Sequence, residues 1–231
     1  MNLSEHTFHD RTRLMTGLCG AMTEWMQDAL SKRRKISIAL SGGTSPGPMY
    51  QDLSHQPLDW EKVTVTLTDE RWVSPEDPSS NEYLIRRRLL HRRAEAATFI
   101  PFKTNHATPA AGAATTERRL KPHLPLDICL LGMGTDGHIA SLVPGAAGYD
   151  VAADPNNSKM IAGLHAEHAA GSPDRMSLTL TAILKARVIA LLIMGDRKRR
   201  VFEEARNQQG HSPVRHLLAQ NRHPVHTFWA P

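Results

Sequence analysis

The residues with the clearest chemical potential form segment 132–138, which reads Gly-Met-Gly-Thr-Asp-Gly-His. The segment follows an apolar run, residues 127–131, that predicts a buried strand. Its glycines let the backbone approach a ligand closely. Asp136 stands two residues before His138, where its carboxylate could orient or polarise the imidazole ring. A lone histidine is more often structural, but this setting at a strand end predicts acid–base chemistry.

A second candidate is segment 41–46, Ser-Gly-Gly-Thr-Ser-Pro, after the predicted strand 36–40. Two adjacent glycines allow a sharp turn whose backbone N–H groups would fit a phosphate oxygen. With Ser45 as N-cap and Pro46 as the first helical residue, the positive end of a helix dipole would also face the anion. Taken alone, the segment also fits a plain strand-to-helix turn.

A third candidate, segment 68–73, follows residues 63–67, whose strict alternation predicts a strand. Asp69, Glu70 and Arg71 fall at the end of this strand, where three charged residues are unusual. The alternative is a surface ion pair that caps the sheet, and it applies to Glu70 above all. Asn81 opens the next predicted helix nearby.

Two cations complete the candidate site. Arg175, in segment 173–180, and Lys198, after the predicted strand 188–194, both fall in expected loops, from which they could reach a phosphate. We expect Arg197, Arg199 and Arg200 to face solvent on the outer side of their helix.

These segments need a scaffold that brings strand ends together. The predicted strands are residues 36–40, 63–67, 98–100, 127–131, 160–164, 188–194 and 223–228, and the predicted helices are residues 3–31, 46–53, 81–92, 109–121, 137–142, 178–184, 196–207 and 213–220. This alternation predicts an α/β fold, a Rossmann-like three-layer sandwich with a mostly parallel central sheet and helices on both faces. We expect residues 1–231 to form one domain, with 144–157 as its longest loop. Because ligands bind beyond the carboxyl ends of such strands, the four segments should converge.

Composition narrows the function classes. The net charge is +5, but the basic clusters are scattered and not interleaved with aromatic residues, so we expect no nucleic-acid partner. The longest apolar run, residues 188–194, is much shorter than the ~20 residues of a membrane span. The first residues lack an apolar signal core, and Cys19 and Cys129 both lie in apolar surroundings. We therefore expect a cytoplasmic protein without a membrane partner.

Several catalytic motifs are absent from the sequence. There is no Gly-x-Ser-x-Gly elbow, no His-Glu-x-x-His helix and no Gly-x-x-x-x-Gly-Lys-Ser/Thr loop. Segment 165–168, His-Ala-Glu-His, lacks a second ligand cluster at matching spacing, so we expect no metal there. The expected chemistry requires neither a metal nor a cofactor.

In order and spacing, segments 40–46, 68–73, 80–81, 132–138 and 140–145 together resemble the 6-phosphogluconolactonase family. The resemblance extends through 175–179 and 195–198, and so over nearly the whole chain. Departures are small, such as Ile139 where the family usually has threonine. The resemblance implies hydrolysis of 6-phospho-D-glucono-1,5-lactone to 6-phospho-D-gluconate, a step of the oxidative pentose phosphate pathway.

The resemblance and the residue chemistry together imply roles for these side chains. The expected catalytic residues are His138, Asp136, Asp69 and Arg71, and the expected substrate-binding residues are Ser41, Gly42, Gly43, Thr44, Asn81, Gly132, Gly134, Arg175 and Lys198. His138 would be the general base for water, with Asp136 fixing its ring. The oxyanion would be stabilised by backbone N–H groups of residues 132–134 or by Arg71, while Asp69 and Asn81 would hold sugar hydroxyls or order Arg71. The phosphate would lie between segment 41–44 and the pair Arg175 and Lys198.

Two alternatives share the expected fold. Glucosamine-6-phosphate deaminases have a similar Asp-Gly-His-Ile-Ala segment that continues with Asn-Glu-Pro, whereas residues 141–144 here read Ser-Leu-Val-Pro, which favours hydrolysis. Non-catalytic sugar-phosphate-binding proteins include sensor domains joined to a helix-turn-helix, for which we expect no room before residue 36. We expect a small-molecule sugar phosphate as substrate and a monomer or small homo-oligomer.

Overall fold

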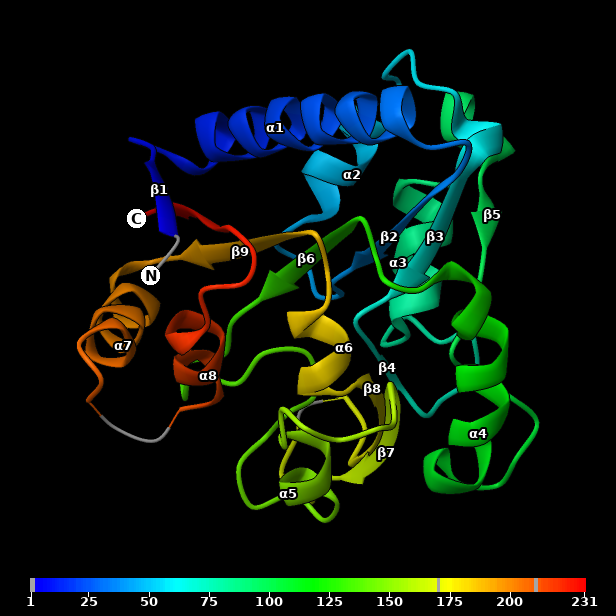
Figure 1. Cartoon of the computed structure of the whole chain (residues 1–231), viewed down its shortest axis with the longest axis vertical. Coiled ribbons are helices and arrows are strands. Elements are labelled where there is room, and N and C mark those ends of the chain that lie inside the picture. Colours follow the sequence, from blue (N-terminus) through cyan, green and yellow to red (C-terminus); the bar gives the residue numbers. More distant parts are fainter. Residues whose placement is uncertain (1–2, 170, 210–211) are drawn as a thin grey trace.

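A computed structural model describes residues 3–169, 171–209 and 212–231. In this part of the chain, a seven-stranded, fully parallel sheet runs through the centre of the molecule in the order β1-β10-β9-β6-β2-β3-β5 (Figure 1). Its strands are β1 (Leu3–Thr7), β2 (Ile36–Leu40), β3 (Val63–Leu67), β5 (Thr98–Phe99), β6 (Ile128–Gly132), β9 (Val188–Met194) and β10 (Val225–Ala230).

A smaller antiparallel sheet branches from the central one. It has the order β4-β8-β7 and consists of β4 (Asp69–Arg71), β7 (Ile161–His165) and β8 (Asp174–Leu178). A single residue, Thr68, separates β3 from β4, and its carbonyl accepts a hydrogen bond from Leu178 N at 2.8 Å. The chain therefore passes directly from the end of β3 into the second sheet.

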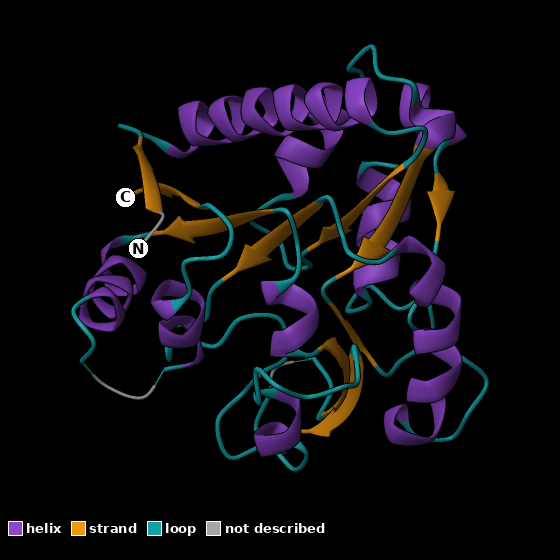
Figure 2. Cartoon of the chain, viewed as in Figure 1, coloured by secondary structure: helices purple, strands orange, loops and turns teal. Residues whose placement is uncertain are grey.

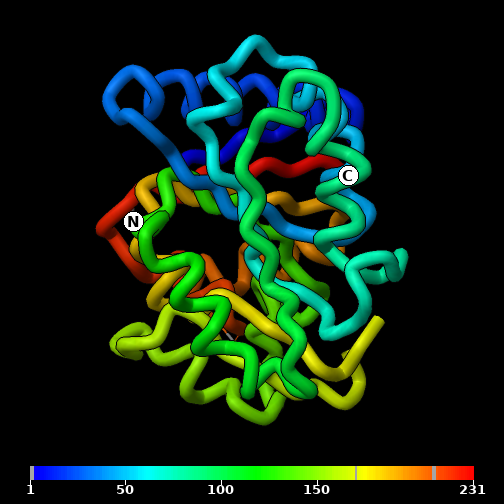
Figure 3. Tube along the Cα trace, turned by 90° about the vertical axis from the view of Figure 1, so that its right-hand side faces the viewer, coloured from blue at the N-terminus to red at the C-terminus, as the bar shows by residue number. Residues whose placement is uncertain are grey.

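Helices cover both faces of the central sheet. They are α1 (Arg11–Lys32), α2 (Gly47–Leu53), α3 (Asn81–Arg88), α4 (Pro109–Leu120), α5 (Tyr149–Ala152), α6 (Leu180–Leu184), α7 (Asp196–Arg206) and α8 (Pro213–Ala219), with 3₁₀ turns η1 (Trp60–Lys62), η2 (Arg92–Ala96) and η3 (Lys121–His123). Figure 2 shows α1 and α2 on one side of the sheet and α6 with the small sheet on the other. Figure 3 shows the same layers from the side. The predicted three-layer α/β sandwich is confirmed.

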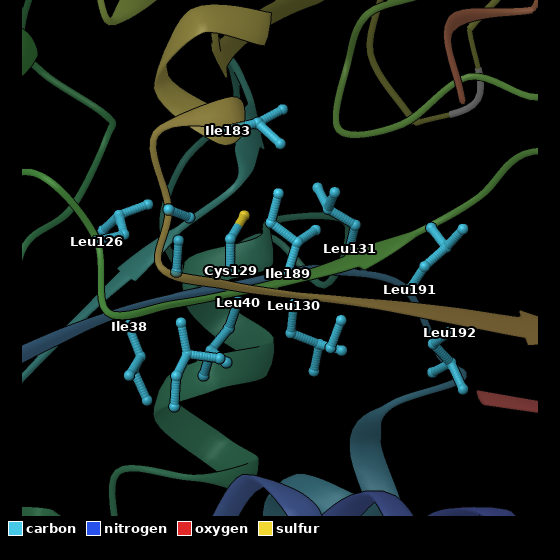
Figure 4. Packing of buried hydrophobic residues seen from close by; sticks show 14 of the residues in the cluster. Ile38, Leu40, Leu126, Cys129, Leu130, Leu131, Ile183, Ile189, Leu191 and Leu192 are labelled. Carbon is cyan, nitrogen blue, oxygen red and sulfur yellow. The ribbon is translucent and has the colours of Figure 1, made fainter. Parts of the chain in front are cut away.

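The core lies between these layers, on both faces of the sheet. All five residues of β2 and of β3 are buried, because the sheet is covered on both faces, and Ser37, Thr64 and Thr66 are therefore buried together with the apolar residues. Leu130 and Leu131 in β6 point to opposite faces (Figure 4). Leu131 lies on the side of Ile183 from α6, while Leu130 faces the side covered by α1.

Some predicted elements were wrong. Residues 3–7 form strand β1 rather than helix, and α1 begins only after Asp10, whose carboxylate accepts a hydrogen bond from Arg13 N at 2.8 Å. The partner of β1 is β10, more than 200 residues away, so no local pattern signals the strand. Residues 137–142 form a loop instead of a helix, with a bridge between Met133 and Ile139. Segment 144–157 contains the short helix α5.

The connection order locates the crevice in the central sheet. From β2 the chain adds β3 and β5 on one side, then returns to place β6 and β9 on the other. The segments after β2 and β6 therefore diverge, and such a switch point is where ligands enter open parallel sheets. No helix of the described residues is long and apolar enough to span a bilayer.

Candidate active site

A cavity of about 870 Å³ opens at the carboxyl ends of the central strands. Every residue that the sequence assigned to the site lines it: Ser41, Gly42, Gly43, Thr44, Asp69, Arg71, Asn81, Gly132, Gly134, Asp136, His138, Arg175 and Lys198. The volume falls in the range of about 300–1,000 Å³ that small-molecule sites occupy. The structure thus brings the four predicted segments to one place.

His138 and Asp136 form a close pair in the segment after β6. The His138 Nδ1 atom lies 2.6 Å from Asp136 Oδ1, and the backbone N–H of His138 donates to the same oxygen at 3.2 Å. This hydrogen bond from the ring lowers the pKa of Asp136 to about 2, so its carboxylate is ionised at neutral pH. With Nδ1 as the donor, Nε2 of the neutral ring is left as a proton acceptor. The imidazole, about one-third exposed at 32%, can act as a base.

Glycines leave the space that this pair occupies. A Cβ on Gly134 would lie 2.3 Å from the His138 ring and 2.5 Å from Asp136 Oδ1. Gly137 has a φ of +80°, and a Cβ there would lie 2.4 Å from Ser212 Cβ. The N–H of Val214 also donates to the Gly137 carbonyl at 3.0 Å. The start of α8 therefore supports the loop from behind.

Asp69 is buried and holds the same loop to the second sheet. Its carboxylate accepts hydrogen bonds from Ser141 Oγ at 2.6 Å and from Thr68 Oγ1 at 3.1 Å. The Arg175 guanidinium lies 3.9 Å from Asp69 and 3.4 Å from Ser141 Oγ. Because Ser141 follows His138 by three residues, this network holds the loop that carries His138.

Arg175 does not lie in a loop, as the sequence suggested, but in strand β8 with only 6% of its surface exposed. Burial lowers the pKa of its guanidinium, and the nearby Asp69 carboxylate opposes that shift. The sequence did not reveal this placement, because β8 carries charged and polar residues that were read as a loop, although it pairs with both the three-residue strand β4 and the neighbouring strand β7. Arg175 lines the cavity together with Asp69.

Glu70 has a structural role that differs from the expected surface ion pair. Its buried carboxylate accepts hydrogen bonds from four donors: Arg71 N at 2.8 Å, Asn81 N at 2.7 Å, Glu82 N at 2.8 Å and Ser80 Oγ at 3.0 Å. Burial raises the pKa of Glu70 to about 7, although each hydrogen bond opposes that shift. The carboxylate joins β4 to the first turn of α3 and so places Arg71 and Asn81 at the cavity.

Segment 41–46 packs tightly against Asn81. A Cβ on Gly42 would lie 1.7 Å from Asn81 Oδ1, so only glycine fits there. Asn81 Nδ2 donates to the Asp69 carbonyl at 2.8 Å, while its buried Oδ1 has no protein partner among the described residues. The expected N-cap at Ser45 was wrong, since α2 begins at Gly47 after Pro46 and has no side-chain cap.

Lys198 lies in the first turn of α7 and lines the cavity on the side of Asp136. Burial lowers the pKa of its amine, and the Asp136 carboxylate opposes that change. The expectation that Arg199 is only solvated was wrong. Arg199 pairs with Glu5 of β1 at 2.9 Å, and it also pairs with Glu203.

Two titratable lining residues were not predicted for the site, Glu167 and His168, which follow β7. Both had been considered only as metal ligands. The described residues contain no group of three or more His, Cys, Asp or Glu side chains placed to hold a metal ion. These two side chains reach the cavity through the second sheet, which the sequence pattern did not predict.

Comparisons with known proteins agree with this geometry. The sequence profile of glucosamine-6-phosphate isomerases/6-phosphogluconolactonase matches residues 9–229. A 6-phosphogluconolactonase from Mesorhizobium japonicum is 38% identical over 98% of this chain and 94% of its own length. One from Rhizobium meliloti is 36% identical over the full length of both chains.

Solved structures show the same relationship. The crystal structure of a 6-phosphogluconolactonase from Shewanella baltica has a TM-score of 0.93 and 33% identity, covering 99% of this chain and 98% of the other. A monomeric glucosamine-6-phosphate deaminase has a TM-score of 0.77 at 18% identity, covering 98% and 97%, which shows the shared fold alone.

Proposed function

Since the chain belongs to the glucosamine-6-phosphate isomerase/6-phosphogluconolactonase family, we propose that it hydrolyses 6-phospho-D-glucono-1,5-lactone to 6-phospho-D-gluconate. Relatives named 6-phosphogluconolactonase match the chain almost from end to end. The observation that carries the proposal is the His138–Asp136 pair, which faces a cavity large enough for a sugar phosphate.

The catalytic step begins with water held by His138 Nε2. The ring takes one proton while the water oxygen attacks C1 of the lactone, and the carbonyl oxygen becomes an oxyanion. When this tetrahedral intermediate collapses, the bond from C1 to the ring oxygen breaks and His138 returns the proton to that oxygen. General acid–base catalysis of this kind contributes about 10²–10⁴-fold. Asp136 keeps the ring in the correct tautomer throughout.

The Arg71 guanidinium, which lines the cavity, stabilises the oxyanion, whereas the Gly134 N–H is not available for this role because it donates to the His138 carbonyl at 2.8 Å. The phosphate lies between segment 41–44 and Lys198, with Arg175 adding positive charge from beneath. Binding energy at the phosphate positions the carbonyl at His138, so gluconolactone without a phosphate should react poorly. Asp69 contributes by holding Ser141 rather than by taking a proton.

A coupled assay tests the activity. The lactone is generated in situ near neutral pH, and 6-phosphogluconate formation is followed above spontaneous hydrolysis. Glucosamine-6-phosphate is tested in parallel, with ammonia as the readout. Acceleration of the first reaction alone supports the proposal, whereas ammonia release from the second would replace it with the deaminase. Absence of both activities would favour a non-catalytic sugar-phosphate-binding protein.

We also propose that residues 1–231 act as one domain, since buried residues of both sheets share one hydrophobic core. Cys19 and Cys129 are buried and free, which supports a reducing compartment such as the cytoplasm. We further propose that the protein is a monomer or small homo-oligomer without a nucleic-acid partner. Gel filtration with light scattering measures the oligomeric state directly.

A further inference from the structure

A second cavity, of about 880 Å³, lies at the amino ends of the central strands, at the end of the sheet opposite the active site. Pro125, Lys185 and His223 in its wall come shortly before β6, β9 and β10, at the amino ends of these parallel strands. Helix α4 and the residues before β7 form the rest of the wall. None of the residues assigned to the active site lines this cavity.

The lining of this cavity is strongly positive. Five cations line the cavity, namely Arg118, Lys121, Lys159, Lys185 and Arg222. With one carboxylate, Glu117, the lining has a net charge of +4, close to the +5 of the whole chain. Glu117 accepts a hydrogen bond from Met160 N at 2.9 Å. Within the described residues, none of the five cations pairs with a carboxylate.

The active-site cavity differs in this respect. Its lining holds three cations, Arg71, Arg175 and Lys198, and three carboxylates, Asp69, Asp136 and Glu167. The charges of the lining Lys, Arg, Asp and Glu side chains therefore balance, in contrast to the second cavity. Unpaired cations around a hollow raise the local concentration of anions and attract them over distance.

The floor of the second cavity is apolar, because Leu124, Met160, Ala182 and Leu184 contribute to it. An inorganic anion would pair with the cations but leave the apolar floor exposed to water. An uncharged apolar ligand would cover the floor but leave the cations without a partner anion. A nucleotide suits both parts, since its phosphates pair with Lys and Arg while its base covers apolar surface. We propose that this cavity binds a nucleotide with two or more phosphate groups.

Isothermal titration calorimetry with ADP on the full chain tests the proposal. Magnesium-free buffer and saturating 6-phosphogluconate keep ADP out of the active site. The variant Lys121→Glu/Lys185→Glu reverses two charges of the lining, both on exposed side chains. The matched control, Arg93→Glu/Arg119→Glu, makes the same change in net charge at exposed positions outside the cavity, one of them on α4 beside Arg118.

We expect ADP to bind in the presence of 6-phosphogluconate, and the Lys121/Lys185 variant to bind at least about ten-fold more weakly. The control should stay within about two-fold of wild type. Adenosine and pyrophosphate should each bind more weakly than ADP. Equal weakening in the control, displacement of ADP by 6-phosphogluconate, or pyrophosphate binding as tightly as ADP would each overturn the proposal. Binding is measured without turnover, and the comparison of the Lys121/Lys185 variant with its control does not require 6-phosphogluconate, so a failure of this proposal can be distinguished from a failure of the lactonase assay.

Discussion

The catalytic pair depends on one short hydrogen bond from an imidazole ring to a carboxylate. Asp136 Oδ1 accepts from both the ring and the backbone of His138, which fixes the ring position and its tautomer together. Segment 132–138 showed this pairing in the sequence, because both residues lie in one short loop. The sequence could not show which ring nitrogen faces the cavity.

Replacing Asp136 by Asn should lower kcat by about 10²–10⁴-fold, because an amide does not hold the ring with Nδ1 protonated and Nε2 free. The side chain is half exposed, so thermal unfolding should change little. Steady-state kinetics with the coupled assay measures the effect. A variant with wild-type kcat would show that the pair is not part of the catalytic machinery.

Glu70 should make stability depend on pH. The folded protein raises the pKa of this buried carboxyl from 4.5 to about 7, so it binds more protons than the unfolded chain between those values. The stabilisation is therefore fully present below pH 4.5 and is lost as pH rises through 7. We expect the free energy of unfolding to fall by about 1–3 kcal/mol over this window from Glu70 alone.

Urea unfolding at a series of pH values measures this dependence. The variant Glu70→Gln cannot titrate at this position, so the difference between the two proteins isolates the contribution of Glu70. A difference that is constant between pH 4.5 and 7.5 would contradict the raised pKa.

At the scale of elements, the segment after β6 is held by side chains from other strands and helices. Ser141→Ala removes the hydroxyl that donates to Asp69, and should cost about 1–3 kcal/mol of unfolding free energy because a buried carboxylate loses a partner. Since the loop carries His138, kcat should fall more than KM rises. Thermal unfolding and steady-state kinetics test both expectations, and Ser141→Thr, which retains the hydroxyl, should recover part of kcat.

The support from α8 can be tested with a matched pair of glycines. Gly137 and Gly145 both have φ near +80°, so alanine strains the backbone at either position. Only at Gly137 would the new Cβ meet a neighbour, Ser212 Cβ at 2.4 Å, since Gly145 has open space. We expect Gly137→Ala to lower the melting temperature more than Gly145→Ala. Equal losses would mean that backbone strain alone sets the cost.

The sequence predicted the elements that have a local pattern and missed those defined by distant partners. The strands at 36–40 and 63–67 were found because their residues are apolar or strictly alternating. The second sheet was missed although a strand at 160–164 was predicted, because β4 has only three residues and the charged and polar residues of β8 were read as a loop. For the same reason Arg175 was placed in a loop, although its part in the site was expected.

Across the whole molecule, every residue predicted for the site lines one cavity, whereas several elements around it were not predicted. Apart from Arg175, which lies within β8, each candidate residue came from a segment that follows a recognisable strand or opens a helix, and parallel strands bring such segments to one end of the sheet. No sequence pattern indicated that one cavity would have a balanced lining and the other a positively charged one. Arg118, Lys185 and Arg222 are far apart in the chain and meet only in the folded protein.

Contacts between the ends of the chain should contribute to global stability. Glu5 of β1 pairs with Arg199 at 2.9 Å and with Arg206 at 2.7 Å, both on the helix that carries Lys198. Glu5→Gln should lower the free energy of unfolding by about 0.5–1 kcal/mol, because these ion pairs are partly exposed. The substitution should also increase the rate of amide hydrogen exchange in β1 more than in β9. Equal acceleration in both strands would argue against a local effect.

The pairing of β1 with β10 also has a consequence for how the protein is made. Residues 3–7 leave the ribosome well before their partner, residues 225–229, which is synthesised more than 200 residues later. At about 5–20 residues per second, β1 waits roughly 10–40 s without a strand beside it. During that interval its N–H and C=O groups are open to other nascent chains on the same messenger. Chaperones that bind emerging chains would therefore protect this protein most at its first strand.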